Sequence, residues 1–266
     1  MIPIYKLSKL VVIATIALTF SVEAAEAPRK IDLKPFKRVD DVVVPLPNEV
    51  FGALNKLGTV NWKDYVRNEK GANFSERPRI ALLLGTVIAD GFIAVQAEDA
   101  PTVKDIGQRV LGLAKGIGVQ SSITQHAKAI TEAADKKNWA IVRQELDRTQ
   151  NSVQQAMTEM QDEKLSHLVS LGGWLRGTAV LTSVVNKKFS ADGAELLHQP
   201  DLLGYFQDRL QAMPQFNSQL LQDIRAALTE VKPLIDVGAT GISADSVKRI
   251  NDITTKIDSA IVSKAP

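Results

Sequence analysis

The pattern of apolar and polar positions predicts helices over most of the chain from residue 47 onward. The clearest pattern lies in residues 137–162, whose apolar or small positions alternate by three and four: Trp139, Val142, Leu146, Thr149, Val153, Ala156 and Met160. This heptad stripe predicts a helix that packs one face against its neighbours. Three heptads inside a domain are more typical of a helix-bundle core than of an extended coiled coil.

The same patterning places further helices along the chain. Ser75 offers an N-cap for a first long helix, and Ser243 offers one for the last helix. The predicted helices cover residues 47–57, 76–98, 103–115, 122–135, 137–162, 165–185, 201–213, 215–231 and a segment after residue 243. We therefore predict an all-α fold, a bundle of about eight to nine helices within a helical domain at 47–266.

The order of these helices repeats. Each series has a long helix rich in small residues, then a break, a short amphipathic helix and two more helices. Leu84-Gly85 in the first series corresponds to Leu171-Gly172 in the second. The hypothesis is that residues 76–162 and 165–263 are duplicated four-helix modules. The alternative is chance, because any all-helical chain can show this order.

Two helical segments are almost entirely apolar. Residues 80–97 hold one charged side chain, Asp90, and residues 171–185 also hold one, Arg176. A helix that is apolar on all sides is either the centre of a bundle or a membrane span. Eighteen residues barely cross a bilayer, so we expect a buried central helix.

Asp90, Arg176 and Trp174 are the candidate ligand-binding residues. If the modules pack through the two apolar helices, Asp90 and Arg176 lie at similar heights and form a pair. The pair is either a structural ion pair or the polar end of a ligand pocket. Trp174 lies in the string Gly-Gly-Trp-Leu-Arg-Gly, where its ring either fills a helix crossing or covers a ligand.

The first 24 residues are typical of an export signal. Lys6 and Lys9 precede an apolar run at residues 10–20, and small residues allow cleavage after Ala24. The run is about half as long as a membrane span, which disfavours a retained anchor. Residues 25–46 are rich in proline and basic side chains, which predicts an extended arm. These features predict a periplasmic protein.

Composition excludes several classes of function. The chain has no cysteine, so it has no disulfide framework, no thiolate metal site and no lipoprotein cysteine. Its formal net charge is only +2 and aromatic residues make up 5%, which disfavours nucleic acid as a partner.

No motif assigns catalytic residues, a metal site or a cofactor. His126, His167 and His198 do not fall at the spacing of helical metal ligands, and His126 is expected on the surface. Three carboxylates gather near the end of the first long helix: Glu98, Asp99 and Asp105. A carboxylate pair can act as acid and base in glycoside cleavage, but carboxylates beside a proline more often cap the next helix.

The sequence therefore favours a non-enzymatic binding or interaction protein of the cell envelope, with a groove between the two modules. Its expected partner is an envelope protein or a small ligand, and the mature chain is expected to lack a transmembrane span. The alternative is an envelope hydrolase that uses a carboxylate pair. The oligomeric state is not indicated.

Overall fold

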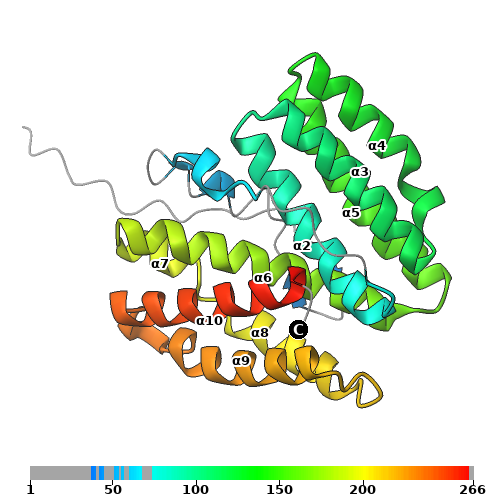
Figure 1. Ribbon diagram of the computed structural model, residues 1–266. Helices are drawn as coiled ribbons and strands as arrows, with labels where there is room; N and C mark the ends of the chain where they lie inside the picture. The colour runs from blue at the N-terminus through cyan, green and yellow to red at the C-terminus, as the bar shows by residue number, and fades with distance from the viewer. Residues whose placement is uncertain are drawn as a thin grey trace, which may run out of the picture. The chain divides into compact units, whose positions relative to one another are not determined.

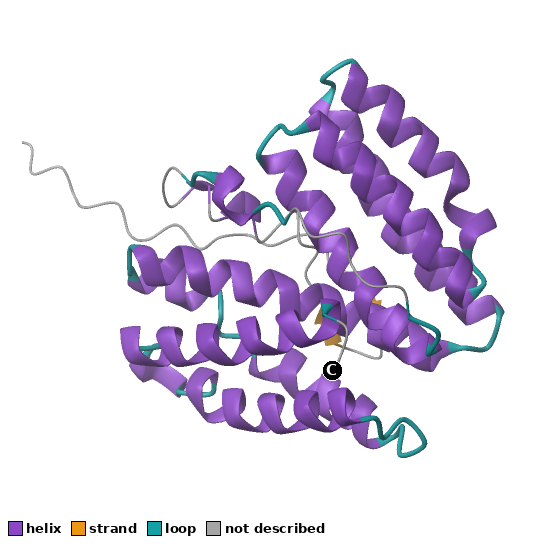
Figure 2. Ribbon diagram, in the orientation of Figure 1, coloured by secondary structure: helices purple, strands orange, loops and turns teal. Residues whose placement is uncertain are grey.

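The computed structural model describes residues 37–39, 42–44, 51–53, 55–56, 60–67 and 74–263, all within the compact unit Leu33–Pro266. Most of these residues are helical (Figure 2). The α-helices of this part of the chain are α2 (Arg77–Gln96), α3 (Ala100–Ile117), α4 (Gln120–Asp135), α5 (Trp139–Glu159), α6 (Glu163–Lys187), α7 (Ala191–Glu195), α8 (Pro200–Gln211), α9 (Gln219–Ile235) and α10 (Ala244–Val262). The predicted all-α bundle of eight to nine helices is confirmed.

Short elements precede α2. Strands β1 (Lys37–Val39) and β2 (Val42–Val44) form an antiparallel hairpin within the predicted arm, and β2 lies against α8. The 3-10 helix η1 (Trp62–Tyr65) follows. The signal segment at 1–24 and most of the arm at 25–46 lie outside the described residues, so both remain predictions.

Helix boundaries differ from the predictions in instructive places. Ser243 caps α10 as predicted, and its Oγ accepts a hydrogen bond from the Ser246 backbone N–H. Ser75 does not cap α2, because the N-cap is Glu76, which makes no side-chain cap. Residues 191–195, which no predicted helix covered, form the short helix α7.

Three of the helix connections share one tight turn built without glycine. Glu98, Lys137 and Gln161 have φ angles of 53°, 54° and 55°, in the left-handed region that disfavours ordinary side chains. In each turn the next residue donates its N–H five residues back, as Asp99 does to the Ala94 carbonyl over 3.0 Å. This Schellman arrangement satisfies carbonyls at the helix end and allows the next helix to begin at once.

The helices form two groups. In the first, α2, α3, α4 and α5 are neighbours in chain order, and α5 returns to α2. In the second, α6, α8, α9 and α10 are neighbours in the same manner, although α6 packs far more extensively on α10 than on α8 (Figure 1). The duplication of the two modules remains a prediction, because the extent of packing differs between corresponding pairs.

The two groups meet where α2 packs along α6, far away in sequence (Figure 1). Glycines allow this approach. A Cβ atom on Gly85 would overlap the carbonyl oxygen of Val169, and one on Gly172 would overlap that of Leu82. Thr86 Oγ1 donates to the carbonyl of Gly172 over 3.3 Å at the same crossing. Only a residue without a Cβ fits at either glycine position.

Helix α2 lies at the centre of the packing. Every residue from Ile80 to Val95 is buried. By length and composition, α2 and α6 could each cross a membrane, but central helices of a bundle meet the same criterion. Nearly all of the apolar window of α2 and more than half of that of α6 are buried against other helices.

Candidate functional site

The two charged residues of the apolar helices form an ion pair. Arg176 Nε donates a hydrogen bond to Asp90 Oδ1 over 2.7 Å. The side chains are 12% and 1% exposed, respectively, so the pair is largely removed from water. The sequence-based expectation of a pair is therefore met, because the glycine crossing brings α2 and α6 close enough.

Arg67 and Asp258 complete what we call the seam cluster, which comprises Arg67, Asp90, Arg176 and Asp258. Arg67 Nη2 donates to Asp258 Oδ2, and Arg67 Nε lies 3.6 Å from Asp90 Oδ2. Arg176 Nη1 lies 3.4 Å from Asp258 Oδ2, and Arg176 Nη2 donates to the Tyr65 carbonyl over 2.8 Å. Each carboxylate thus faces two guanidinium groups.

The charges of the seam cluster balance within the cluster. Two arginines and two aspartates leave no net charge, and all four side chains are at most 12% exposed. The cluster joins the segment after η1 to α2, α6 and α10. Removing one partner from such a pair strongly destabilises the fold, because it leaves a buried charge without compensation. This arrangement favours the structural interpretation of Asp90 and Arg176 over the ligand-pocket one.

Trp174 lies away from the seam cluster. Its ring packs at a tilted angle on Phe206, with centroids 5.5 Å apart, and its Nε1 donates to Gln199 Oε1 over 3.2 Å. Phe206 belongs to α8, and Gln199 is its N-cap. The contacts of Trp174 thus hold α6 against α8, and the structure does not bring it together with Asp90 and Arg176.

The chain itself covers the seam between the two helix groups. Asn55 Nδ2 donates to Gln96 Oε1 at the end of α2 over 3.0 Å, and Trp62 Nε1 donates to Asn55 Oδ1 over 2.7 Å. Further along, Lys187 Nζ at the end of α6 donates to Asp64 Oδ2 over 3.3 Å. Residues 60–67 therefore occupy part of the space between the modules in which a binding groove was predicted (Figure 1).

Of the carboxylates near the end of α2, Asp99 has a defined structural role. Asp99 is the N-cap of α3: its Oδ1 accepts from the Thr102 N–H over 3.1 Å and its Oδ2 from the Thr102 hydroxyl over 2.8 Å. Glu98 and Asp105 are exposed. The cap interpretation of Asp99 is confirmed.

His126 and His167 make side-chain contacts that their sequence context did not indicate. His126 is not a simple surface residue: its ring contacts Glu145 and Ser152 of α5, and its side chain is 23% exposed. His167 Nδ1 lies 2.8 Å from the Tyr205 hydroxyl. None of these three contacts was predicted from the sequence, because the partners lie between 19 and 38 residues away in the chain and no local spacing marks them. Among the described residues, no three His, Asp or Glu side chains gather closely enough to hold a metal ion.

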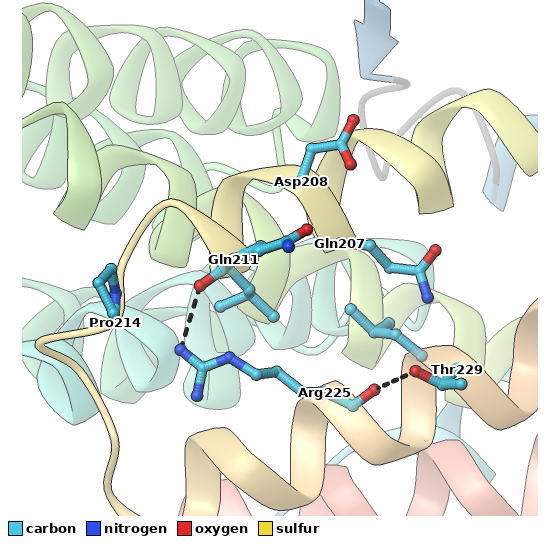
Figure 3. A pocket seen from close by; sticks show the side chains of 8 residues that line it. Gln207, Asp208, Gln211, Pro214, Arg225 and Thr229 are labelled. Atoms are coloured by element: carbon cyan, nitrogen blue, oxygen red, sulfur yellow. Dashed lines mark hydrogen bonds between the residues drawn. The ribbon is translucent and has the colours of Figure 1, made fainter.

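A groove opens between α8 and α9 of the second group (Figure 3). Its volume is about 580 Å³, within the range of small-molecule sites. The lining residues are Gln207, Asp208, Leu210, Gln211, Pro214, Arg225, Leu228 and Thr229.

Arg225 stabilises the backbone at one end of this groove. Its Nη2 donates to the carbonyls of Leu210, Met213 and Phe216 at 3.1, 3.2 and 3.0 Å. These carbonyls belong to the end of α8 and the following loop, where helical carbonyls lack partners. One guanidinium thus fixes the α8–α9 connection and the wall of the groove.

Comparisons with known proteins give no relative: no protein-family model matches the chain, and no curated protein or solved structure is detectably similar to it.

Proposed function

We propose that this chain is an exported binding protein of the cell envelope that holds a protein partner in the α8–α9 groove. The observation that carries the proposal is the groove itself, which is open and lined by polar side chains over an apolar floor. The charged residues that the sequence offered for chemistry are used elsewhere: Asp90 and Arg176 face opposite charges in the seam cluster, and Asp99 caps a helix.

The groove suits a short peptide segment. Leu210 and Leu228 are buried and supply an apolar floor for one side chain. Gln207 and Gln211 of α8 line the groove, and the carboxylate of Asp208 lies at its rim and points away from Arg225 and Thr229 (Figure 3). Amide side chains both donate and accept, so they match the N–H and C=O groups of an extended peptide. A small polar ligand is the second possible occupant.

Export is the other half of the proposal. Its support is the predicted signal segment at 1–24 and the absence of cysteine, which leaves the mature chain independent of the redox state of its compartment. The carboxylate-pair hydrolase is less well supported, because Asp99 is occupied as a cap and Asp90 is paired with Arg176.

The lack of cysteine allows a direct test. Thr229→Cys would place a single thiol at the exposed rim of the groove, and the control Lys128→Cys would place one on the exposed face of α4. Each variant is labelled with benzophenone maleimide, incubated with envelope extract and irradiated.

We expect discrete adducts from the groove position, their absence from the control position, and their loss when Asp208→Lys is added. Equal adduct patterns from both positions would contradict a specific role for the groove. Adducts with a small molecule only, seen by mass spectrometry, would replace the protein partner with a ligand.

A further inference from the structure

A hydrogen-bonded chain of three side chains links α4 to α5. His126 Nδ1 lies 2.8 Å from Glu145 Oε2, and His126 Nε2 lies 3.0 Å from Ser152 Oγ. Glu145 and Ser152 are seven positions apart, nearly two helical turns, so they share the face of α5 that meets α4. The serine, imidazole and carboxylate are therefore in line, with the imidazole in the middle.

The hydrogen bonds determine the role of each nitrogen. An ionised carboxylate only accepts, so Nδ1 must carry the proton that points to Glu145. In the neutral imidazole, Nε2 is then the acceptor and takes the hydroxyl proton of Ser152. This is the assignment of a serine nucleophile and its base in acyl-transfer enzymes, where the acid holds Nδ1 and the serine meets Nε2.

Glu145 is held in its ionised form. Burial raises the pKa of its carboxyl group, but the hydrogen bonds and charges of His126 and Arg148 outweigh burial, so the pKa is lowered overall. Arg148 Nη1 bonds to Glu145 Oε1, the oxygen not used by His126. Both carboxylate oxygens are thus fixed, which holds the imidazole in one orientation.

We propose that Ser152 is an activated nucleophile toward small carboxylic esters, with His126 as its general base and Glu145 as a positioning residue. Ser152 and His126 are both partly exposed on the surface of the α4–α5 pair, so a solute can reach the hydroxyl. This activity would be separate from the α8–α9 groove, whose lining residues lie on other helices.

The reaction would proceed in two halves. The Ser152 Oγ forms a bond to the ester carbonyl carbon while its proton moves to His126 Nε2. The tetrahedral adduct then expels the alkoxide, which takes that proton and leaves as an alcohol. Water, deprotonated by the same imidazole, attacks the acyl-serine, and the carboxylic acid leaves as serine recovers its proton.

The helical setting limits the substrate class. Backbone N–H groups in the middle of α5 are used within the helix, so the backbone next to Ser152 offers no oxyanion donors. Arg148, one turn before Ser152 with a half-exposed side chain, supplies the nearby positive charge. The site therefore suits activated esters, which need little oxyanion stabilisation, and not peptide bonds.

The test uses the full chain with p-nitrophenyl acetate and with a fluorophosphonate probe, and mass spectrometry locates the adduct. We expect labelling at Ser152, and Ser152→Ala and His126→Ala should each lower the rate by about 100-fold or more. Ser259→Ala, at an exposed serine on α10, is the matched control and should leave the rate unchanged.

Two further measurements separate chemistry from structure. Added imidazole should restore part of the rate to His126→Ala, and Glu145→Asp should retain more activity than Glu145→Ala. Circular dichroism establishes that each variant is folded. Labelling of Ser152 no faster than that of Ser259, or an unchanged rate in folded His126→Ala, would overturn the proposal, whatever the fate of the groove.

Discussion

Buried charge is the main feature of this molecule at the scale of single residues. The seam cluster places four ionised groups among apolar helices, each facing groups of opposite charge. An isolated charge at the position of Asp90 would be strongly unfavourable, but the two arginines compensate it. The cluster therefore determines how residues 60–67 lie on the helices more than it adds to net stability.

Removing one member of the seam cluster should destabilise the fold, because its partners then lack a compensating charge. Asp90→Ala leaves Arg176 and Arg67 without one of their carboxylates, so the free energy of unfolding should fall by about 3–5 kcal/mol in a urea melt. Asp64→Ala removes an exposed partner of Lys187 and should cost less than about 1 kcal/mol. Equal stabilities of Asp90→Ala and the wild type would show that the pair is not formed.

Glu145 should make stability depend on pH in one direction. Its folded pKa lies below the ordinary value of 4.5, so its stabilising contribution is complete above that value. The contribution is lost as the pH falls through the lower folded pKa. The stability difference between wild type and Glu145→Gln should therefore be largest at neutral pH and shrink in acid.

The matched control is Glu132→Gln, an exposed residue 3.9 Å from Lys128 on α4. The stability of the Glu132→Gln variant relative to wild type should vary little with pH in denaturant melts between about pH 3 and 7. A difference for Glu145→Gln that grows in acid would contradict the lowered pKa.

Part of the candidate site could be predicted from the sequence. Asp90 and Arg176 stand out because each is the only charge in an apolar helix, and such charges must find partners. Arg67 and Asp258 lie in segments with many polar residues, where nothing marks them as buried. The link of His126 to Glu145 and Ser152 depends on the pairing of α4 with α5, which local pattern does not determine.

At the scale of elements, the crossing of α2 and α6 depends on two glycines. Gly85→Ala would bring a Cβ into the Val169 carbonyl, which is backbone and cannot move aside, so the helices must separate. The free energy of unfolding should fall by about 1–3 kcal/mol or more, as at other overpacked core sites. Gly112→Ala on α3 meets nothing within 4 Å and should gain about 0.5–1 kcal/mol from helix propensity.

Thermal melts of the two glycine variants provide the comparison. A midpoint for Gly85→Ala at or above that of the wild type would contradict the close crossing. The pair was visible in the sequence as the Leu-Gly match between the two series.

Element boundaries were less predictable than the elements themselves. The apolar stripes located the long helices because burial requires one continuous face. The turns after α2, α4 and α5 instead use Glu98, Lys137 and Gln161 in a left-handed conformation, where glycine is the usual signal. Hydrogen bonds at the helix ends stabilise the left-handed conformation of these residues. Their residue types did not predict that conformation.

At the scale of the whole molecule, the described helices form two groups joined along α2 and α6, and residues 60–67 lie over the seam between them. The groove between the modules that the sequence favoured is therefore occupied in part by the chain itself. The α8–α9 groove lies within the second group and was not predicted, because its walls are ordinary polar positions of two amphipathic helices.

Export predicts a shortened chain. Signal cleavage after Ala24 should give a mature protein that begins at Ala25. Amino-terminal sequencing or intact mass of the protein recovered from the envelope measures this directly. A recovered chain that still begins at Met1 would contradict the signal assignment.

We propose that the seam cluster is structural and that partners bind in the α8–α9 groove. The most direct test combines Asp90→Leu and Arg176→Met, a nearly neutral exchange because it leaves Arg67 paired with Asp258. Cross-linking from benzophenone at Thr229→Cys is then compared with and without the double substitution. We expect the same adducts in both proteins. A folded double variant that loses its adducts would show that the seam cluster belongs to the binding site.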